Sequence, residues 1–366
     1  MARTGSFLAA TLIATASITS GAAAQSTSTA QPVAETSTVE NETRDYAAIL
    51  TRFDQIVGQM LFDPRILTEQ RWINFRAQFG ALSEDAQTDA EFEAAFDTAL
   101  ANADLFSHLS LHIDESARAN QAEPDTASAN AEPLARFENL GDGIGLMRIR
   151  SFQGEGLLEL LNQVFDQAIE SGVATLIIDL RGNPGGNFSA WPVGTRLIRE
   201  PLQFGQLVAG KWYATHSAPP TLQEIADATP MTVPDGPTLV ADLMDDGLSV
   251  FAALPQEPTY SGRVFVLIDE RTGSTSEIVA AGLQRSGIAQ IVGQRSAGQV
   301  LNANRIPLAE GISLQLPIAD FMLPDGSRLE GVGIVPDFPT ASDDALECAI
   351  TISHGANNCE AETPPQ

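Results

Sequence analysis

One stretch, residues 264–285, constrains the fold of this chain more than any other. It opens with the β-branched and aromatic run Val264–Ile268, which has the length of a strand, and an apolar pattern at helical spacing begins at Ile278. Charged residues and Gly273 separate the two halves, so the stretch predicts a strand, a tight turn and a helix. Ser274 follows the glycine. Such a unit raises one hydroxyl to the end of a sheet, where the N–H groups of a helix start face a concave surface.

Ser274 also has a purely structural interpretation. The run Ser274–Glu277 matches a capping box, in which the serine side chain accepts from the N–H three residues on and the glutamate reaches back. Caps are far commoner than active sites, so this stretch alone favours a cap over a nucleophile. Residues elsewhere in the chain have to decide between the two.

The chain is strongly acidic, with 47 Asp and Glu against 20 Lys and Arg and a formal charge of -27. This charge argues against nucleic acid or an anionic membrane surface as a partner. The length of 366 residues allows one large hydrophobic core or two modest ones.

The N-terminal residues 1–24 are typical of a secretory signal. Arg3 supplies a positive start, Phe7–Ile18 a short apolar stretch, and Ala22–Ala24 a small-residue cleavage site. No apolar run reaches the roughly 20 residues that a membrane helix needs. We therefore expect an exported protein, periplasmic or extracellular, with no membrane span. Residues 25–44 lack apolar periodicity and predict a flexible leader.

Residues 45–113 carry apolar side chains at helical spacing and predict an N-terminal bundle of three helices. The segment ends in an alternating polar and apolar run that predicts a strand carrying Ser107 and His108. The alternation places His108, Ser110 and His112 on one face of that strand.

The second half of the chain predicts an α/β domain. Residues 114–134 are rich in Ala, Asn, Glu and Pro and predict a linker. Residues 135–345 combine strand and helix patterns, and the Pro-rich part of 188–262 predicts an insertion or flap over the site.

A glycine-rich turn follows the most hydrophobic of these strands. Ala174–Leu180 is a continuous apolar run typical of a strand buried in a sheet, and it leads into Arg181–Asn187. Gly185 and Gly186 belong to this turn, whose exposed N–H groups suit an anion or an oxyanion. A plain structural turn is the equally simple alternative.

Two cysteines, Cys348 and Cys359, lie close together near the C-terminus. In an exported chain such a pair usually closes, so we predict a disulfide that holds the tail, residues 346–366. A metal site is less favoured, because His354 is the only additional ligand nearby.

The order of these parts resembles the tail-specific, or carboxyl-terminal processing, serine protease family. The resemblance rests on the helical bundle and on four motifs: Ser107–His108, Leu176–Gly186, Thr272–Glu277 and Glu330–Asp337. It implies an α/β fold with a crotonase-like core, a peptide or protein substrate, and Ser274 as the nucleophile.

The chain departs from the better-known family members in two ways. Those members use a Ser/Lys dyad, but the matching turn Gly293–Gly298 is followed here by Gln299, which accepts no proton at neutral pH. The only lysine is Lys211, in a poorly patterned segment. The family's PDZ domain also has no counterpart, because only the linker separates the bundle from the core.

Both departures resemble the branch typified by the tricorn protease core. On that comparison His108 is the general base, Ser107 and Glu330 are its hydrogen-bonded support, and Ser274 attacks. Chemistry agrees, because a serine hydroxyl becomes a nucleophile only when an oriented imidazole takes its proton. His112 is the competing base, and the alternative for Glu330 is an exposed carboxylate in a turn.

The backbone N–H of Thr275 and an N–H of Gly185 or Gly186 are the expected oxyanion donors. We therefore predict an exported serine peptidase that forms an acyl-enzyme and needs no metal or other cofactor. Two other classes stay open: an inactive relative that binds peptides or apolar ligands, and a hydrolase of another acyl substrate. The sequence does not indicate whether the protein is a monomer or an oligomer.

Overall fold

The computed structural model describes residues 44–113, 132–233 and 235–359. The predicted signal segment, all but the last residue of the leader, and residues 114–131 of the predicted linker lie outside these ranges.

Three α-helices begin the described chain, and they share one aromatic core. The helices are α1 (Tyr46–Met60), α2 (Gln70–Ser83) and α3 (Asp89–Ala101), with a short 3-10 turn, η1 (Pro64–Thr68), after the first. Phe53, Phe79 and Phe96 are fully buried and meet edge to face, with ring centroids 5.2 to 6.2 Å apart. This core is where the helical spacing of apolar residues puts their side chains.

A five-stranded antiparallel sheet packs against these helices. Its strands are β1 (Ser110–Ile113), β5 (Leu202–Ala209), β6 (Leu248–Ala253), β9 (Asn302–Ala309) and β10 (Ile312–Met322), in the order β1-β10-β5-β6 with β9 also on β10. Leu111, Leu314 and Leu316 belong to the same buried cluster as the helices, so one face of this sheet closes the aromatic core.

A second, six-stranded sheet forms the centre of the α/β part. It contains β2 (Ala135–Gly141), β3 (Ile144–Ile149), β4 (Thr175–Asp179), β7 (Arg263–Ile268), β8 (Ala289–Gly293) and β11 (Phe338–Pro339), in the order β11-β8-β7-β4-β3-β2. All neighbours are parallel except β2 and β3. The carboxyl ends of the parallel strands meet at one edge, which is where open α/β sheets place their sites.

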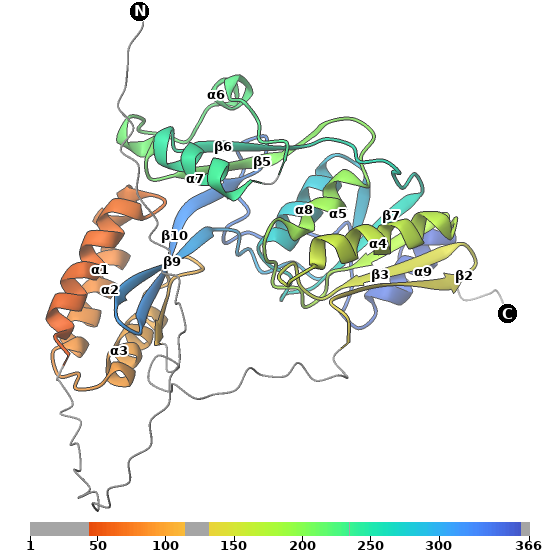
Figure 1. Ribbon diagram of the computed structural model, residues 1–366. Helices are drawn as coiled ribbons and strands as arrows, with labels where there is room; N and C mark the ends of the chain where they lie inside the picture. Colours follow the sequence, from red (N-terminus) through yellow and green to blue (C-terminus); the bar gives the residue numbers. More distant parts are fainter. Residues whose placement is uncertain (1–43, 114–131, 234, 360–366) are drawn as a thin grey trace, which may run out of the picture. The chain divides into compact units, whose positions relative to one another are not determined.

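Helices cover both faces of this sheet (Figure 1). Ile178 and Val266 pack in one cluster with α4 (Leu157–Glu170), α5 (Trp191–Thr195) and α8 (Thr275–Arg285). Ile177 and Phe265, their alternate neighbours, pack with α9 (Ala345–Ser353) on the other face. Leu176, Ile177 and Ile178 are consecutive apolar residues because both faces of β4 are buried, and the predicted mixed α/β fold is confirmed.

The structure departs from the predicted elements in two places. Ser107 and His108 lie in a turn before β1, because the φ of His108 is 61°, which no strand allows. The strand β2 has no counterpart among the predicted strands, since most of its side chains are exposed and leave no apolar alternation.

Residues 188–262 contain more regular structure than their proline content indicates. Besides α5, β5 and β6, they form α6 (Leu222–Asp227), α7 (Gly236–Asp245) and the 3-10 turns η3 (Phe188–Ala190) and η4 (Trp212–Ala214). Their contribution to the site comes from side chains on η3, α5, β5, β6 and α7.

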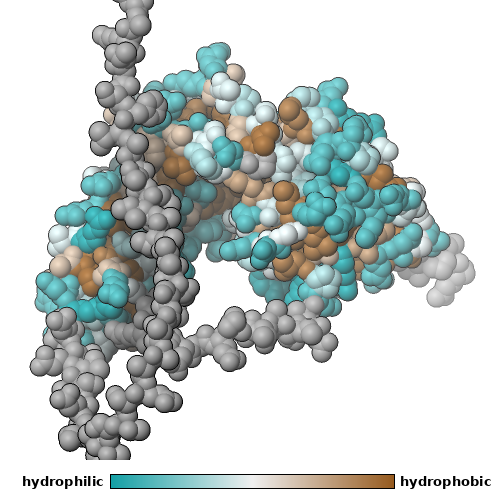
Figure 2. Space-filling view, viewed as in Figure 1, coloured by the Kyte–Doolittle hydropathy of each residue, from teal (hydrophilic) through white to brown (hydrophobic). Residues whose placement is uncertain are grey.

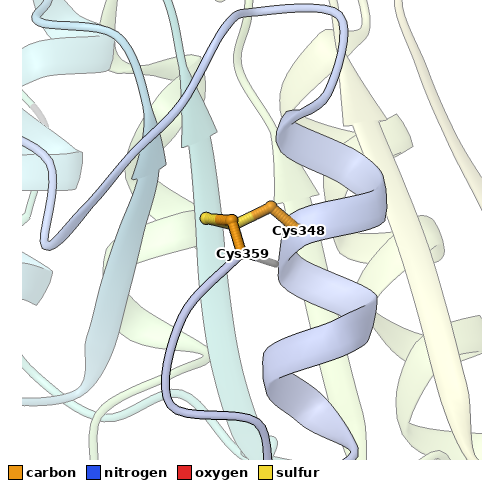
Figure 3. The surroundings of a disulfide bond; sticks show 2 residues. All are labelled: Cys348 and Cys359. Atoms are coloured by element: carbon orange, nitrogen blue, oxygen red, sulfur yellow. A yellow bond between two sulfur atoms is a disulfide. The ribbon is translucent and has the colours of Figure 1, made fainter. Parts of the chain in front are cut away.

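The predicted disulfide is present. Cys348 on α9 and Cys359 are bonded, with Cα atoms 4.5 Å apart (Figure 3). In residues 44–113, 132–233 and 235–359, no helix has the length and apolar character needed to span a bilayer. The face shown in Figure 2 is mainly hydrophilic, with separate apolar patches.

Candidate active site

Ser274 lies at the junction of β7 and α8, at the carboxyl edge of the parallel sheet. Its φ and ψ are 53° and -125°, a region that a residue with a Cβ seldom occupies. A serine held in a strained turn between a strand and a helix presents its hydroxyl away from the backbone, as in the nucleophile elbow of other hydrolases. The sequence prediction of a strand, a turn and a helix here is confirmed.

The capping box exists, but its main hydrogen bonds do not involve the Ser274 hydroxyl. Glu277 Oε2 accepts from the Ser274 N–H at 3.1 Å. The Glu277 N–H lies within reach of the hydroxyl, yet its hydrogen bond of 2.8 Å goes to the Ser274 carbonyl. The cap and the nucleophile are therefore compatible interpretations of one serine.

Glu277 is completely buried and ties the helix start to the turn that follows β8. Its carboxylate also accepts from Ser296 Oγ at 2.6 Å and from the N–H groups of Gly298 and Gln299 at 2.7 and 2.9 Å. Burial raises the pKa of Glu277, and these hydrogen bonds act in the opposite direction.

The glycine turn after β4 lies directly against Ser274. A Cβ on Gly185 would stand 2.6 Å from the Ser274 Cβ, so only glycine fits there. Thr275 Oγ1 donates to the Gly186 carbonyl at 3.0 Å, which fixes the turn to the start of α8.

The two candidate oxyanion glycines differ in their hydrogen bonding. The Gly185 N–H donates to Asn183 Oδ1 at 2.9 Å, within an Asx turn. The N–H groups of Gly186 and Thr275 donate to no acceptor in the part of the chain that the structure describes. Among the predicted donors, Gly186 and Thr275 are thus available and Gly185 is engaged.

His108 is held by a chain of hydrogen bonds that ends at a carboxylate. Ser107 Oγ lies 2.6 Å from His108 Nδ1 and 3.1 Å from Glu330 Oε2. Because a carboxylate only accepts, the single hydroxyl proton goes to Glu330, and Ser107 Oγ accepts the Nδ1–H. This tautomer leaves the lone pair on Nε2.

Both carboxylate oxygens of Glu330 accept hydrogen bonds from the backbone around this group. Oε1 accepts from the Ser107 N–H at 2.9 Å, and Oε2 accepts from the Val300 N–H at 2.9 Å. Burial lowers the pKa of His108, and the charge of Glu330 raises it in opposition.

Two consecutive residues connect the two halves of the site. The Gln299 carbonyl accepts the Ser274 N–H at 2.8 Å, and the next residue, Val300, donates to Glu330. Gln299 therefore acts through its backbone, and its side chain is exposed.

Ser274 and His108 line the same cavity of about 560 Å3. No hydrogen bond joins their side chains in the described residues, a common state for catalytic pairs without substrate. The wall is mostly apolar and includes Phe188, Trp191, Phe204, Leu239 and Phe251.

The remaining candidate bases lie elsewhere. His112 Nε2 is 2.9 Å from Ser110 Oγ on β1, and His216 stacks on Trp212 at 3.8 Å. His354 follows the end of α9, and neither it nor Lys211 lines the cavity.

The comparisons with known proteins identify the family of this chain. A model of peptidase family S41 matches residues 143–340, more than half of the chain. The chain belongs to peptidase family S41. This is a family of serine proteases, and the resemblance to carboxyl-terminal processing proteases is confirmed.

Two curated relatives and one solved structure show how far the similarity extends. A carboxyl-terminal-processing protease of Picosynechococcus is 24% identical over 58% of this chain and 43% of its own length. A chloroplastic C-terminal processing peptidase of Tetradesmus obliquus is 27% identical over 58% of this chain and 38% of its length. This S41 chain thus spans about two fifths of the length of these relatives.

The solved structure of a photosystem II D1 C-terminal processing protease has the same fold. Its TM-score is 0.53 at 15% identity, over 82% of this S41 chain and 94% of that chain.

Sequence reasoning did not assign roles to several residues that build this S41 site. Asn183 orients the glycine turn, and an Asn before Pro-Gly-Gly is a signal for such a turn. Glu277 was visible only as a cap. Part of the apolar wall comes from residues 188–262. The sequence predicted an insertion or flap over the site in this segment, but not which of its side chains line the cavity with Ser274.

Proposed function

We propose that this S41 chain is a serine peptidase in which Ser274 attacks the scissile carbonyl and His108 is the general base. Ser107 and Glu330 orient the imidazole. The observation that carries the proposal is a single cavity lined by Ser274 and by a histidine whose other nitrogen is fixed through Ser107 to a carboxylate.

The proposed chemistry balances without any further group. Ser274 Oγ bonds to the substrate carbonyl carbon as its proton passes to Nε2 of His108. The same proton then moves to the leaving amine, which departs and leaves an acyl-enzyme. His108 next takes a proton from water, whose oxygen attacks the carbonyl carbon of the ester. The bond from that carbon to Ser274 Oγ then breaks as His108 returns the proton to Oγ, and the carboxylic acid product leaves.

Two backbone N–H groups are placed to receive the developing oxyanion. Gly186 and Thr275 have uncommitted N–H groups and are linked to each other through the Thr275 side chain. One such donor contributes on the order of 10²- to 10³-fold in turnover. Gly185 then serves the site by close packing against Ser274 rather than as a donor.

The lining of the cavity is also compatible with one related function. The apolar wall would also accept the acyl chain of an ester, so a non-peptidase acyl hydrolase is the second candidate. An ester panel compared with a peptide library separates the two by kcat/KM.

The finer structural and cellular assignments are part of the same proposal. We assign residues 45–113 to a helical bundle, 135–345 to a crotonase-like core of the tricorn-like branch, and 1–24 to export. The parallel order β8-β7-β4-β3, with the serine helix on one face, supports the assignment of the core.

Labelling with a fluorophosphonate and hydrolysis of a peptide library test the proposal on the purified protein. Ser274→Ala should lose both signals, and His108→Ala should lose on the order of 10⁴- to 10⁶-fold in kcat/KM. His112→Ala is the matched control and should keep activity, because His112 does not line the cavity. Full activity in Ser274→Ala, or loss in His112→Ala with retention in His108→Ala, overturns the assignment.

A further inference from the structure

The charge of the active-site cavity differs from that of the whole chain. The chain carries a formal charge of -27, yet no Asp or Glu is among the described residues that line the cavity. Arg305 is the one Arg or Lys in that lining. The lining therefore offers a ligand one guanidinium and no carboxylate, while Glu330 lies behind His108 and Ser107, and a guanidinium favours an anionic group on the ligand.

Arg305 differs from the arginines of this protein that are held in ion pairs. Arg181, Arg196 and Arg328 each pair with an aspartate. Within the ranges that the structure describes, Arg305 forms neither an ion pair nor a hydrogen bond, and its side chain is exposed. Its five N–H donors are available, and their planar fork matches a carboxylate.

The strand that carries Arg305 starts beside the catalytic groups. Val300, whose N–H donates to Glu330, precedes β9 by two residues. Arg305 is five positions along the chain from Val300, which corresponds to at most about 16 Å. A substrate in extended conformation covers that length with about five residues.

The outer edge of β9 is available to such a substrate. In the described chain β9 pairs only with β10, so its other edge has unpaired backbone groups. Ala303 and Arg305 are two residues apart on β9, and both line the cavity. Gln315, which is opposite Arg305 on β10, lines it too. A peptide added along this edge would pass from Ser274 toward the guanidinium.

We propose that Arg305 is a specificity residue that binds a carboxylate of the peptide substrate, about five residues from the scissile bond. The inference rests on the proposed peptidase function and names its substrate class. The carboxylate is either the C-terminus of the substrate or an Asp or Glu side chain, and both present the same group to Arg305.

Three sets of matched peptides test this proposal. One set ends in a free acid or an amide at varied distance from the scissile bond. The second places Glu or Gln at each position of an amidated peptide, and the third replaces the acidic residue by Lys. We expect kcat/KM to be about tenfold higher for a peptide with a carboxylate near the fifth position than for its neutral twin.

The preference should depend on Arg305 alone. Arg305→Gln should bring the ratio of acidic to neutral peptide close to one, and Arg305→Glu should favour the Lys peptide instead. Arg52→Gln is the matched control, an exposed arginine on α1 outside the cavity, and should keep the tenfold ratio. Dependence on the free C-terminus identifies tail trimming, and dependence on Glu identifies an internal acidic motif.

The failure of this inference is distinguishable from failure of the peptidase assignment. Fluorophosphonate labelling of Ser274 tests the peptidase assignment by itself, without any peptide substrate. A labelled, active enzyme with equal kcat/KM for acidic and neutral peptides overturns the role of Arg305, as does a preference that persists in Arg305→Gln. If no hydrolysis is seen, binding of the same peptides by fluorescence anisotropy still has to show the carboxylate dependence.

Discussion

Ser274 and His108 both have a positive φ, which most residues other than glycine avoid. They are two of four non-glycine residues with positive φ in the described ranges, at 53° and 61°. Such conformations cost on the order of 1–3 kcal/mol each and persist only where the surroundings enforce them. Here hydrogen bonds enforce them: Glu277 and Gln299 hold the Ser274 N–H, and Glu330 holds the turn that contains His108.

The charge of Glu330 should be visible in the pH dependence of the reaction. Glu330 raises the pKa of His108 against the opposing effect of burial, so Glu330→Gln should lower that pKa further. Because a general base works in its unprotonated form, activity appears above the pKa, and the acid limb of kcat/KM should move to lower pH. The plateau should fall by about 10- to 10³-fold, since the support of the imidazole is weakened.

A pH–rate profile of both proteins measures this shift. Glu138→Gln, which neutralises an exposed carboxylate on β2, is the control and should leave the acid limb in place. An acid limb that stays fixed or moves to higher pH in Glu330→Gln would show that the carboxylate does not act on His108.

At this scale the sequence predicted residue types better than their partners. Ser274 and His108 were identifiable because few histidines compete and a turn precedes the serine. The choice between Gly185 and Gly186 depends on the Asn183 side chain, which no periodicity describes. Arg305 was missed because its significance lies in the lack of a partner within the described ranges, a property of the folded molecule.

Among the helices, α3, α6 and α8 start with the same capping pattern but differ in what the glutamate contacts. Glu91 and Glu224 reach back to their caps at the surface, whereas Glu277 is completely buried and accepts four hydrogen bonds. The capping pattern is the same in all three helices. Because Glu277 is buried, it also fixes α8 to the turn that carries Gln299.

Glu277→Gln should therefore destabilise the fold by about 2–4 kcal/mol, because an amide has one acceptor oxygen and would place N–H against N–H. Ser274 labelling should slow in the same variant. Glu224→Gln in α6 is the matched control, in an exposed box, and should cost less. Denaturant unfolding of the three proteins gives the comparison, and equal losses in the two variants would deny Glu277 any role beyond capping.

The predicted helices and strands agree best with the structure where the apolar pattern in the sequence is strongest. The strands β4, β7 and β8 lie within one or two residues of their apolar runs because both of their faces are buried. The edge strand β2 was missed, since an exposed strand needs no apolar residues. The start of β1 was placed too early, because alternation continues into a turn whose φ only the fold enforces.

In the α/β part, the central sheet separates Ser274 from the C-terminal segment. Ser274 begins α8, which packs on one face of this sheet, while α9 and its disulfide pack on the other. Cys348 is buried with Ile177 and Phe265, so the disulfide fixes the end of the chain to the back of the same strands that carry the site.

Loss of this disulfide should reduce stability without loss of the site. The two bonded cysteines are 11 residues apart in sequence. A disulfide that closes a loop of this length contributes about 3 kcal/mol to the free energy of unfolding, mainly by restricting the unfolded chain. We expect Cys359→Ala to lower Tm by about 5–10 °C, while the rate of Ser274 labelling at 25 °C stays within about twofold. Cys359 is the residue to change, because truncating the buried Cys348 would add a cavity.

Reductant supplies the internal control for this prediction. It should bring the Tm of the native protein down to that of Cys359→Ala and leave the variant unchanged, since only the native protein has a bond to break. A variant with unchanged Tm would mean that α9 is held by packing alone. A variant with normal Tm and slow labelling would mean that the two faces of the sheet are coupled, because a change behind the strands would then alter the geometry at their carboxyl ends.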